Sequence, residues 1–389
     1  MKKIMVLYGT RPEAIKLAPV VRALQDESEL DGVVTVTGQH REMLDQVNNL
    51  FGIKPEHDLD IMVPGASLDE IAARALTSVS AVLRSEKPDV VVIQGDTSTA
   101  FVAGLAAFYQ QIPVVHVEAG LRTGDLMSPF PEEANRQLAA RITALHLAPT
   151  ATAKSNLISE NVDEPSIVVT GNTVIDALHE ALTVPVQFGD RRVEEIVGSG
   201  ERYVLVTAHR RESWGEPMRQ AMTAVRETAL THPDLQWVLP MHRNPVVREV
   251  LVEMLSDTPN VLLTEPLTYH EFCHAMERSH LLLTDSGGVQ EEAPSLGKPV
   301  LVMRDTTERP EAITAGTVEL VGTATHRVGS ALTRLLDDES EYSIMANAVN
   351  PYGDGRAAER SIAALRAMLG FGERLPDYTP EAIENGVKP

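Results

Sequence analysis

The sequence predicts two α/β domains, each built as a doubly wound parallel sheet with helices on both faces. Its 389 residues exceed the ~250–300 residues at which a single hydrophobic core stops growing. The candidate strands are continuously apolar rather than alternating, and helical patterns separate them, which is typical of parallel sheets. Glycines and polar residues follow several of these strands directly, where open α/β sheets bind their ligands.

The first half of the chain shows this rhythm most clearly. Pro12 opens a helix that runs to about Gln25, since proline is favoured in a first helical turn. Ser67 and Glu70 form a capping-box pattern before a helix that ends near Arg84. The strands predicted for this half are Ile4–Tyr8, Val33–Thr37, Asp89–Gln94, Val114–Glu118, Leu145–Ala148 and Ile167–Thr170.

The second half repeats the pattern after a break that contains Pro185 and Gly189. Its predicted strands are Tyr203–Thr207, Leu235–Leu239, Val261–Leu263, Leu281–Thr284, Pro299–Met303 and Val318–Val321. We therefore expect an N-terminal domain at 1–181, a linker at 182–190 and a C-terminal domain at 191–350. We also expect a helix within 351–370 that packs back on the N-terminal domain, and a tail at 371–389.

The bulk composition restricts the class of partner. A formal charge of −21 argues against non-specific binding to nucleic acid or to acidic membranes, so an anionic ligand would require a local cluster of cations. Cys273 is the only cysteine, which excludes an intramolecular disulfide and favours a small core residue. The longest apolar run, Ala100–Phe108, is far below a membrane span of ~20 residues. We expect a cytoplasmic protein without membrane insertion.

An unusually long connection follows the strand that ends at Glu118. Ordinary strand-to-helix connections have ~2–6 residues, whereas this one continues past Arg122 and Asp125 to the helix that starts at Glu132 and Glu133. A long loop rich in ionisable groups is more often a site than a spacer. The alternative is that the two glutamates only complement the helix dipole.

A second candidate site is the segment from Thr284 to Glu292, which joins a strand to a helix. The adjacent Gly287 and Gly288 allow a ligand to approach the backbone closely. The amide groups at the helix start and the Ser286 hydroxyl would bind phosphate, and Glu292 could accept hydrogen bonds from a ribose diol. The alternative is a structural turn with Ser286 as the helix N-cap.

Several cations follow other predicted strands. Arg11 and Lys16 could hold a diphosphate, or could form a solvated basic turn. His209, Arg210 and Arg309 are further candidates for an anionic ligand.

Other motifs exclude or weaken alternative functions. The P-loop motif, the Gly-x-Gly-x-x-Gly motif and zinc-binding Cys–His spacing are absent, and we expect no metal. Asp58-Leu59-Asp60 has the Asp-x-Asp pattern that can bind a metal–nucleotide complex, but a solvated turn is favoured. His116 is expected to be a hydrogen-bonded structural histidine. Phe272 is expected either in the core or stacked on a base.

Nine segments carry a family resemblance over nearly the whole chain: Gly9–Glu13, Gly38–Arg41, Gly95–Thr97, His116–Arg122, Ser128–Glu133, Thr170–Asp176, His209–Glu212, Thr284–Lys298 and Asn350–Gly355. With these motifs the chain resembles the non-hydrolysing UDP-N-acetylglucosamine 2-epimerases. One departure is Ser213-Trp214, in a loop beside His209.

The resemblance implies a GT-B-type fold, in which two Rossmann-like domains face each other across a cleft that holds the substrate. It implies interconversion of UDP-GlcNAc and UDP-ManNAc without a cofactor, through elimination of UDP to 2-acetamidoglucal and re-addition. Inversion at C2 requires groups on both faces of the sugar, and hence more than one carboxylate. Which carboxylate serves which face stays open.

The resemblance also implies roles for individual residues. The acid–base candidates are Asp96, Glu118 and Glu132, and Arg136 is expected to orient Glu132, whereas Glu133 is assigned to the helix start or the fold. His209, Arg11 and Lys16 are expected to offset charge on the diphosphate. The remaining substrate contacts are expected from His242, Phe272 at the uracil, Ser286, Gly287, Gly288, Glu292 and Arg309.

Some expectations concern regulation and alternatives. The resemblance implies a second, activating UDP-GlcNAc near Gln39, Arg41, Gln46 and Arg210, a homodimer, and a role in cell-envelope polysaccharide biosynthesis. A hydrolysing relative that releases ManNAc, a GT-B glycosyltransferase and a non-catalytic nucleotide-sugar sensor remain alternatives.

Overall fold

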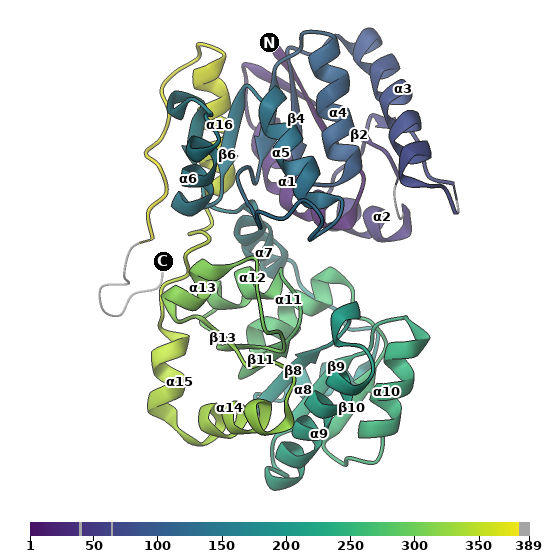
Figure 1. Cartoon of the computed structure of the whole chain (residues 1–389), viewed down its shortest axis with the longest axis vertical. Coiled ribbons are helices and arrows are strands. Elements are labelled where there is room, and N and C mark those ends of the chain that lie inside the picture. Colours follow the sequence, from purple (N-terminus) through teal and green to yellow (C-terminus); the bar gives the residue numbers. More distant parts are fainter. Residues whose placement is uncertain (39–40, 64, 381–389) are drawn as a thin grey trace. The chain divides into compact units, whose positions relative to one another are not determined.

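The computed structural model describes residues 1–38, 41–63 and 65–380, which form two compact units (Figure 1). Unit 1 comprises Met1–Ala181 and Tyr352–Thr379, and unit 2 is built on Leu182–Pro351. The chain therefore leaves unit 1, builds unit 2 and returns, so that α16 (Ala357–Met368), yellow in Figure 1, lies among the purple and teal elements of unit 1. Both sheets are wholly parallel, which confirms the predicted fold class.

The sheet of unit 1 has the strand order β3-β2-β1-β4-β5-β6-β7. Its central strands are buried on both faces because helices cover the sheet on each side. One group of helices that pack on each other is α3, α4 and α5, and another is α1, α2 and α16. The strands are β1 (Lys2–Tyr8), β2 (Leu30–Val36), β3 (His57–Asp58), β4 (Val90–Gln94), β5 (Val114–Val117), β6 (Leu145–Ala148) and β7 (Ile167–Val169).

The helices of unit 1 begin at the caps that the sequence indicates. The predicted capping box forms at Ser67–Glu70 before α3, and Pro12 lies in the first turn of α1 as predicted. A second capping box, Thr10–Glu13 before α1, was not predicted. Besides α16 and the 3₁₀ turn η1 (Glu164–Ser166), the helices are α1 (Arg11–Gln25), α2 (Arg41–Leu50), α3 (Leu68–Glu86), α4 (Ser98–Tyr109), α5 (Glu132–Ile142), α6 (Ala151–Ser159) and α7 (Thr173–Thr183).

The edge strand β3 differs from the prediction. His57 and Asp58 pair with β2 opposite Thr35 and Val36, so a solvated turn at Asp58-Leu59-Asp60 is wrong at its first residue. A two-residue edge strand is held by backbone hydrogen bonds on one side alone, and therefore needs no apolar side chains that would reveal it in the sequence.

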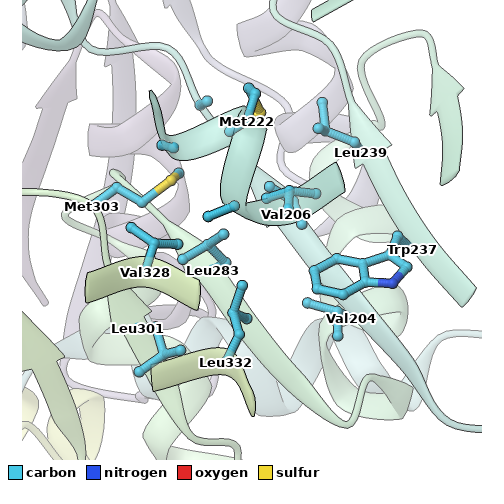
Figure 2. Packing of buried hydrophobic residues seen from close by; sticks show 14 of the residues in the cluster. Val204, Val206, Met222, Trp237, Leu239, Leu283, Leu301, Met303, Val328 and Leu332 are labelled. Atoms are coloured by element: carbon cyan, nitrogen blue, oxygen red, sulfur yellow. The ribbon is translucent and has the colours of Figure 1, made fainter. Parts of the chain in front are cut away.

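Unit 2 has the strand order β10-β9-β8-β11-β12-β13. Its core packs side chains of the sheet against α9 and α14, with Trp237 fully buried beside Val204 and Leu239 (Figure 2). The strands are β8 (Tyr203–Thr207), β9 (Gln236–Pro240), β10 (Val261–Thr264), β11 (Leu281–Thr284), β12 (Val300–Val302) and β13 (Val318–Leu320).

Helices alternate with the strands of unit 2, as the predicted rhythm requires. They are α8 (Arg191–Gly198), the 3₁₀ turn η2 (Arg211–Ser213), α9 (Glu216–Thr231), α10 (Pro245–Leu255), α11 (Tyr269–Arg278), α12 (Val289–Ser295), α13 (Pro310–Ala315), α14 (Thr325–Asp337) and α15 (Glu339–Ala346). Within the described ranges, every helix is too short or too polar to cross a membrane.

Candidate active site

Each sheet has one point where its strand order reverses, and ligands of open α/β sheets bind beyond the strand ends at such points. In unit 1 this point lies between β1 and β4, and in unit 2 it lies between β8 and β11. The predicted site residues Asp96 and His209 directly follow these strands, after Gly95 and Ala208.

Glu118 follows β5 in a backbone conformation that non-glycine residues rarely adopt, with φ of 63°. Its side chain is only 7% exposed. The carboxylate accepts hydrogen bonds from Lys16 Nζ, from Gln94 Nε2 and from Asn172 Nδ2, the last at 3.1 Å. A solvated basic turn is therefore wrong for Lys16, which pairs with a candidate catalytic carboxylate.

Asp96 is held by a different cation. Its carboxylate lies 2.6 Å from Arg136 Nη2, and its backbone carbonyl accepts a hydrogen bond of 2.8 Å from Asn135 Nδ2. Arg136 Nη1 also donates to Glu133 at 3.2 Å. The expectation that Arg136 orients Glu132 is therefore wrong, because the guanidinium pairs with Glu133, three residues back, and with Asp96.

Glu133 belongs to the fold, as expected. Its buried carboxylate accepts hydrogen bonds from the backbone of Thr123 (3.1 Å) and Gly124 (3.3 Å) and from Gln137 (3.0 Å). Burial raises the pKa of Glu133, but these donors and Arg136 outweigh burial, so its pKa lies below the usual range. Glu133 thus remains ionised and anchors the long loop that follows Glu118.

Glu132, the neighbour of Glu133, has the opposite environment. It is the first residue of α5, one turn before Arg136. Its Oε2 atom is buried and has no hydrogen-bond partner among the residues that the structure describes. A buried carboxylate oxygen without a donor is costly, and of the three acid–base candidates Glu132 is the one with such an oxygen in the described part of the chain.

Two buried residues fix the loop that carries Asp96. His116 Nε2 lies 2.7 Å from the carbonyl oxygen of Gly95, which confirms a structural histidine, and burial lowers its pKa to about 4. Glu13 accepts hydrogen bonds from the backbone of Gly9 (2.9 Å) and Thr10 (2.7 Å), and from Thr97 Oγ1 (2.6 Å). It thereby joins the ends of β1 and β4. A Cβ atom on Gly95 would lie 3.7 Å from Glu118 Oε2, so the Glu118 carboxylate lies against the loop that carries Asp96.

The predicted phosphate loop of unit 2 is not capped by Ser286. The N-cap of α12 is Gly288, so the alternative of a turn with Ser286 as the N-cap is wrong. In the described part of the chain the Ser286 hydroxyl has no hydrogen-bond partner, while its backbone N–H donates to Thr284 Oγ1 at 2.9 Å. Arg309 lies against the loop, because a Cβ atom on Gly287 would meet its Nη1 at 2.7 Å. Arg309 Nε also donates to Glu291 at 2.7 Å.

The residues expected at the nucleoside lie on two helices of unit 2. Glu292 of α12 is buried and accepts a hydrogen bond of 3.0 Å from the Tyr269 hydroxyl of α11. Phe272 lies three residues after Tyr269 on α11, is half-buried, and is not a member of the main core cluster of unit 2.

His209 is held by the buried carboxylate of Asp285, which follows β11. Nδ1 of the imidazole lies 2.9 Å from Asp285 Oδ1. Burial raises the pKa of Asp285, but hydrogen bonds from the imidazole and from the backbone of His209 and Arg210 outweigh burial and lower it overall. The ring of His242 stacks on His209 with centroids 6.0 Å apart.

The residues expected at an activating site are less well defined. Gln39 lies outside the described residues. Arg41 pairs with Asp58 at 2.7 Å, and Gln46 is exposed on α2. Arg210 Nε is buried and unpartnered among the described residues. Arg11, at the first position of α1, is exposed.

Comparison with known proteins agrees with these motifs. A family model described as UDP-N-acetylglucosamine 2-epimerase matches residues 22–366. The chain belongs to this family.

Two relatives illustrate how much of the chain the likeness covers. The UDP-N-acetylglucosamine 2-epimerase of Escherichia coli (strain K12) is 52% identical over 94% of this chain and 98% of its own length. The crystal structure of the UDP-GlcNAc 2-epimerase from Neisseria meningitidis, bound to UDP-GlcNAc, is 48% identical with a TM-score of 0.87, and the match covers 94% of this chain and all of that one.

A more distant relative has the same fold. The structure of the Methanocaldococcus jannaschii UDP-GlcNAc 2-epimerase in complex with UDP-GlcNAc and UDP is 34% identical, with a TM-score of 0.77, over 95% of this chain and all of that one. The expectation of two Rossmann-like domains of the GT-B type is confirmed.

The sequence of this epimerase did not identify the residues that form hydrogen bonds with the candidate site residues or with the loops that carry them. They are Glu13, Gln94, Asn135, Asn172, Tyr269 and Asp285. Gln94 and Asp285 adjoin predicted strand ends, which is a signal that could have marked them. Glu13 forms a capping box with Thr10, which a local pattern could have marked, but its contact with Thr97 spans 84 residues. Asn135, Asn172 and Tyr269 act across 23 to 54 residues of sequence, and no local pattern reports such pairings.

Proposed function

We propose that this chain is a non-hydrolysing UDP-GlcNAc 2-epimerase, which interconverts UDP-GlcNAc and UDP-ManNAc. The match to the family model and the N. meningitidis relative that was crystallised with UDP-GlcNAc support the substrate. The observation that carries the reaction is the presence of Asp96, Glu118 and Glu132 in three different environments in unit 1. Inversion at C2 requires proton transfer on both faces of the sugar, which one carboxylate cannot provide.

The chemistry follows from the weak acidity of the proton at C2, which is not adjacent to a carbonyl group. Direct removal would leave a free carbanion, so the reaction proceeds by elimination. A base takes the C2 proton, the C–H electrons form the C1=C2 double bond, and the C1–O electrons leave with UDP. The products are 2-acetamidoglucal and UDP, and re-addition of UDP with a proton delivered to the opposite face of C2 gives the epimer.

The candidate carboxylates differ in their capacity to take a proton. Glu118 already accepts hydrogen bonds from a lysine and two amides, and Asp96 is paired with Arg136. Glu132 has a buried oxygen without a donor among the described residues, and therefore has an open lone pair. General acid–base groups typically contribute ~10²–10⁴-fold each. Arg136 is assigned to orient Asp96.

The departing diphosphate gains charge as C1–O breaks, so cations must stabilise it. We assign His209, Arg11 and Lys16 to this role. In unit 2, the Ser286 hydroxyl, Gly287 and Gly288 offer a loop that a phosphate can approach, with Arg309 against it and His242 beside His209. Glu292 is assigned to the ribose, and Phe272, half-buried on the neighbouring helix, to the uracil.

Proton NMR of UDP-GlcNAc with this protein in heavy water tests the reaction. We expect UDP-ManNAc with deuterium at C2 in both epimers. An epimer without deuterium at C2 would exclude elimination. Release of free ManNAc would indicate the hydrolysing reaction, and turnover that needs an acceptor would indicate a glycosyltransferase.

We also propose a second UDP-GlcNAc as an activator, recognised by Arg41, Gln46 and Arg210, together with a homodimer, a cytoplasmic location and a role in cell-envelope polysaccharide biosynthesis. Of the first three residues, Arg210 has the clearest support, because its buried Nε lacks a partner among the described residues. A sigmoidal rate at low UDP-GlcNAc that becomes hyperbolic in an Arg210→Ala variant tests the activator.

A further inference from the structure

The carboxylate of Asp285 lies at the switch point of unit 2, which is the place where the strand order of its sheet reverses, between β8 and β11. Its side chain is only 1% exposed, and its Oδ2 atom accepts two backbone hydrogen bonds, from His209 at 2.7 Å and from Arg210 at 2.8 Å. These bonds leave Oδ1 directed at His209, whose Nδ1 lies 2.9 Å away. The plane and the position of the carboxylate are therefore set before any ligand binds.

The strands beneath this pair are tied together as well. The hydroxyl groups of Thr207 and Thr284, which end β8 and β11, lie 2.6 Å apart, and the backbone N–H of Asp285 donates to the Thr207 carbonyl at 3.3 Å. Trp214 Nε1 donates to the carbonyl oxygen of His209 at 3.3 Å. The backbone that carries the imidazole is therefore held in place beside Asp285.

We propose that Asp285 is a positioning residue that fixes His209 with its proton on Nδ1 and presents Nε2 to the ligand. This inference rests on the proposed role of His209 at the diphosphate. An ionised carboxylate only accepts hydrogen bonds, so a proton on Nδ1, 2.9 Å from Oδ1, is the arrangement that this carboxylate favours. The His209 side chain is 38% exposed, and Nε2 is the ring nitrogen left for a phosphate oxygen.

The other charged groups near His209 act differently from Asp285. His242 stacks on its ring, and burial together with His209 lowers the pKa of His242, which favours a neutral neighbour. Arg248 also lowers the pKa of His242, although its guanidinium is paired with Glu265 at 2.5 Å. Asp285 is thus the group that compensates a proton on His209.

An Asp285→Asn variant separates the two functions of this carboxylate. The amide oxygen can still accept the two backbone hydrogen bonds, but the amide nitrogen is a donor and must face Nδ1. Neutral His209 would then carry its proton on Nε2. A matched control is Asp176→Asn, because Asp176 also accepts two consecutive backbone hydrogen bonds, from Ala357 (3.2 Å) and Ala358 (2.8 Å), but faces no imidazole through them.

The test combines kinetics with nitrogen NMR of the full chain labelled in its twelve histidines, with His209 assigned by its loss in a His209→Gln variant. We expect Nδ1 protonation of neutral His209 in the wild type and Nε2 protonation in Asp285→Asn. We expect kcat to fall about 10²–10⁴-fold in Asp285→Asn with KM within threefold, and within twofold of wild type in Asp176→Asn.

Two results would overturn the proposal: neutral wild-type His209 protonated on Nε2, or an Asp285→Asn variant with wild-type kcat. Beyond the His209→Gln assignment, the wild-type spectrum does not depend on Asp285→Asn, so misfolding of Asp285→Asn does not remove the test. The spectrum also needs no turnover. If the wild type does not convert UDP-GlcNAc, the proposed function fails, while the protonation of His209 still decides this inference.

Discussion

The two switch points share a strand order and differ in charge. In unit 1 the strand ends present the carboxylates of Asp96 and Glu118, each paired with one cation. In unit 2 they present His209, Arg210 and His242 around the single carboxylate of Asp285. The same topology thus determines where groups meet, while the residues after each strand determine the charge that is presented there.

Each switch point also contains one buried carboxylate that binds the backbone, and these two carboxylates titrate in opposite directions. Burial raises the pKa of Glu13, and its hydrogen bonds from Thr97, Gly9 and Thr10 compensate only in part. Asp285 has its pKa lowered overall because an imidazole joins the backbone donors. Glu13 has only neutral donors and therefore acts on the structure alone. Asp285 faces an ionisable imidazole, so its charge is linked to the protonation of His209.

The largest expected effect tests the division of labour between the units. Glu118→Gln keeps the shape of the side chain but removes its charge and its capacity as a base. We expect kcat to fall about 10²–10⁴-fold, while the affinity for UDP, measured by calorimetry, stays within twofold of wild type. A comparable loss of UDP affinity would show that the units do not divide the work in this way.

A smaller effect is expected from the phosphate loop of unit 2. In Gly287→Ala the new Cβ would lie 2.7 Å from Arg309 Nη1, so the guanidinium must move. We expect UDP to bind about tenfold more weakly, which corresponds to about 1.4 kcal/mol. Gly329→Ala in α14 is the control, because its Cβ meets only Ala224 Cβ, at 4.0 Å. Equal UDP affinity in both variants would show that the position of Arg309 against the loop does not affect UDP binding.

The opposite pKa shifts predict opposite pH dependences of stability. The pKa of Glu13 is raised above 4.5, so its contribution is present below pH 4.5 and is lost as the pH rises through the folded-state pKa. The pKa of Asp285 is lowered below 3.8, so its contribution is present above pH 3.8 and is lost as the pH falls. Each pKa unit corresponds to about 1.4 kcal/mol.

Urea unfolding between pH 3 and pH 7 measures both trends. The stability of wild type relative to Glu13→Gln should fall as the pH rises, and relative to Asp285→Asn it should rise. Both tryptophans, Trp214 and Trp237, lie in unit 2, so their fluorescence reports Asp285→Asn, and circular dichroism is needed for Glu13→Gln. If both stability differences changed with pH in the same direction, the proposed opposite pKa shifts of Glu13 and Asp285 would be wrong.

The smallest expected effect concerns the ribose. The Tyr269 hydroxyl donates to Glu292 Oε1 at 3.0 Å and is also hydrogen-bonded with Cys273, so Tyr269→Phe removes both contacts and keeps the ring. We expect about a threefold weaker preference for UDP over 2′-deoxy-UDP, within the ~0.5–1.5 kcal/mol of one hydrogen bond. Competition between the two nucleotides measures it, and an unchanged preference would assign Tyr269 to packing alone.

The sequence predicted the central strands because burial on both faces leaves continuous apolar runs, such as Val114–Val117. It did not predict β3, whose two residues are polar and whose pairing is made by the backbone. The helix α2 was also missed, although Leu44 and Val47 are buried on it, because its other residues are mostly polar.

The candidate site shows the same limit in another form. Motifs marked Glu118 and His209, but not the partners Gln94 and Asp285, which reach them through the tertiary structure over 24 and 76 residues of sequence. Arg136 could have reached Glu132 or Glu133 from its helix, and only the position of Asp96 decides between them. Choices of this kind depend on the packing of elements that are remote in sequence.

The return of α16 to unit 1 has a consequence for synthesis of the protein. Asp176 caps α16 through the backbone of Ala357 and Ala358, and Arg366 of α16 pairs with Glu29 at 2.8 Å. Unit 1 therefore waits for its last helix until the ribosome has translated the whole of unit 2, about 10–30 s later at ordinary elongation rates. The segment Leu182–Pro351, on which unit 2 is built, is continuous in sequence and can fold first, although it is encoded second.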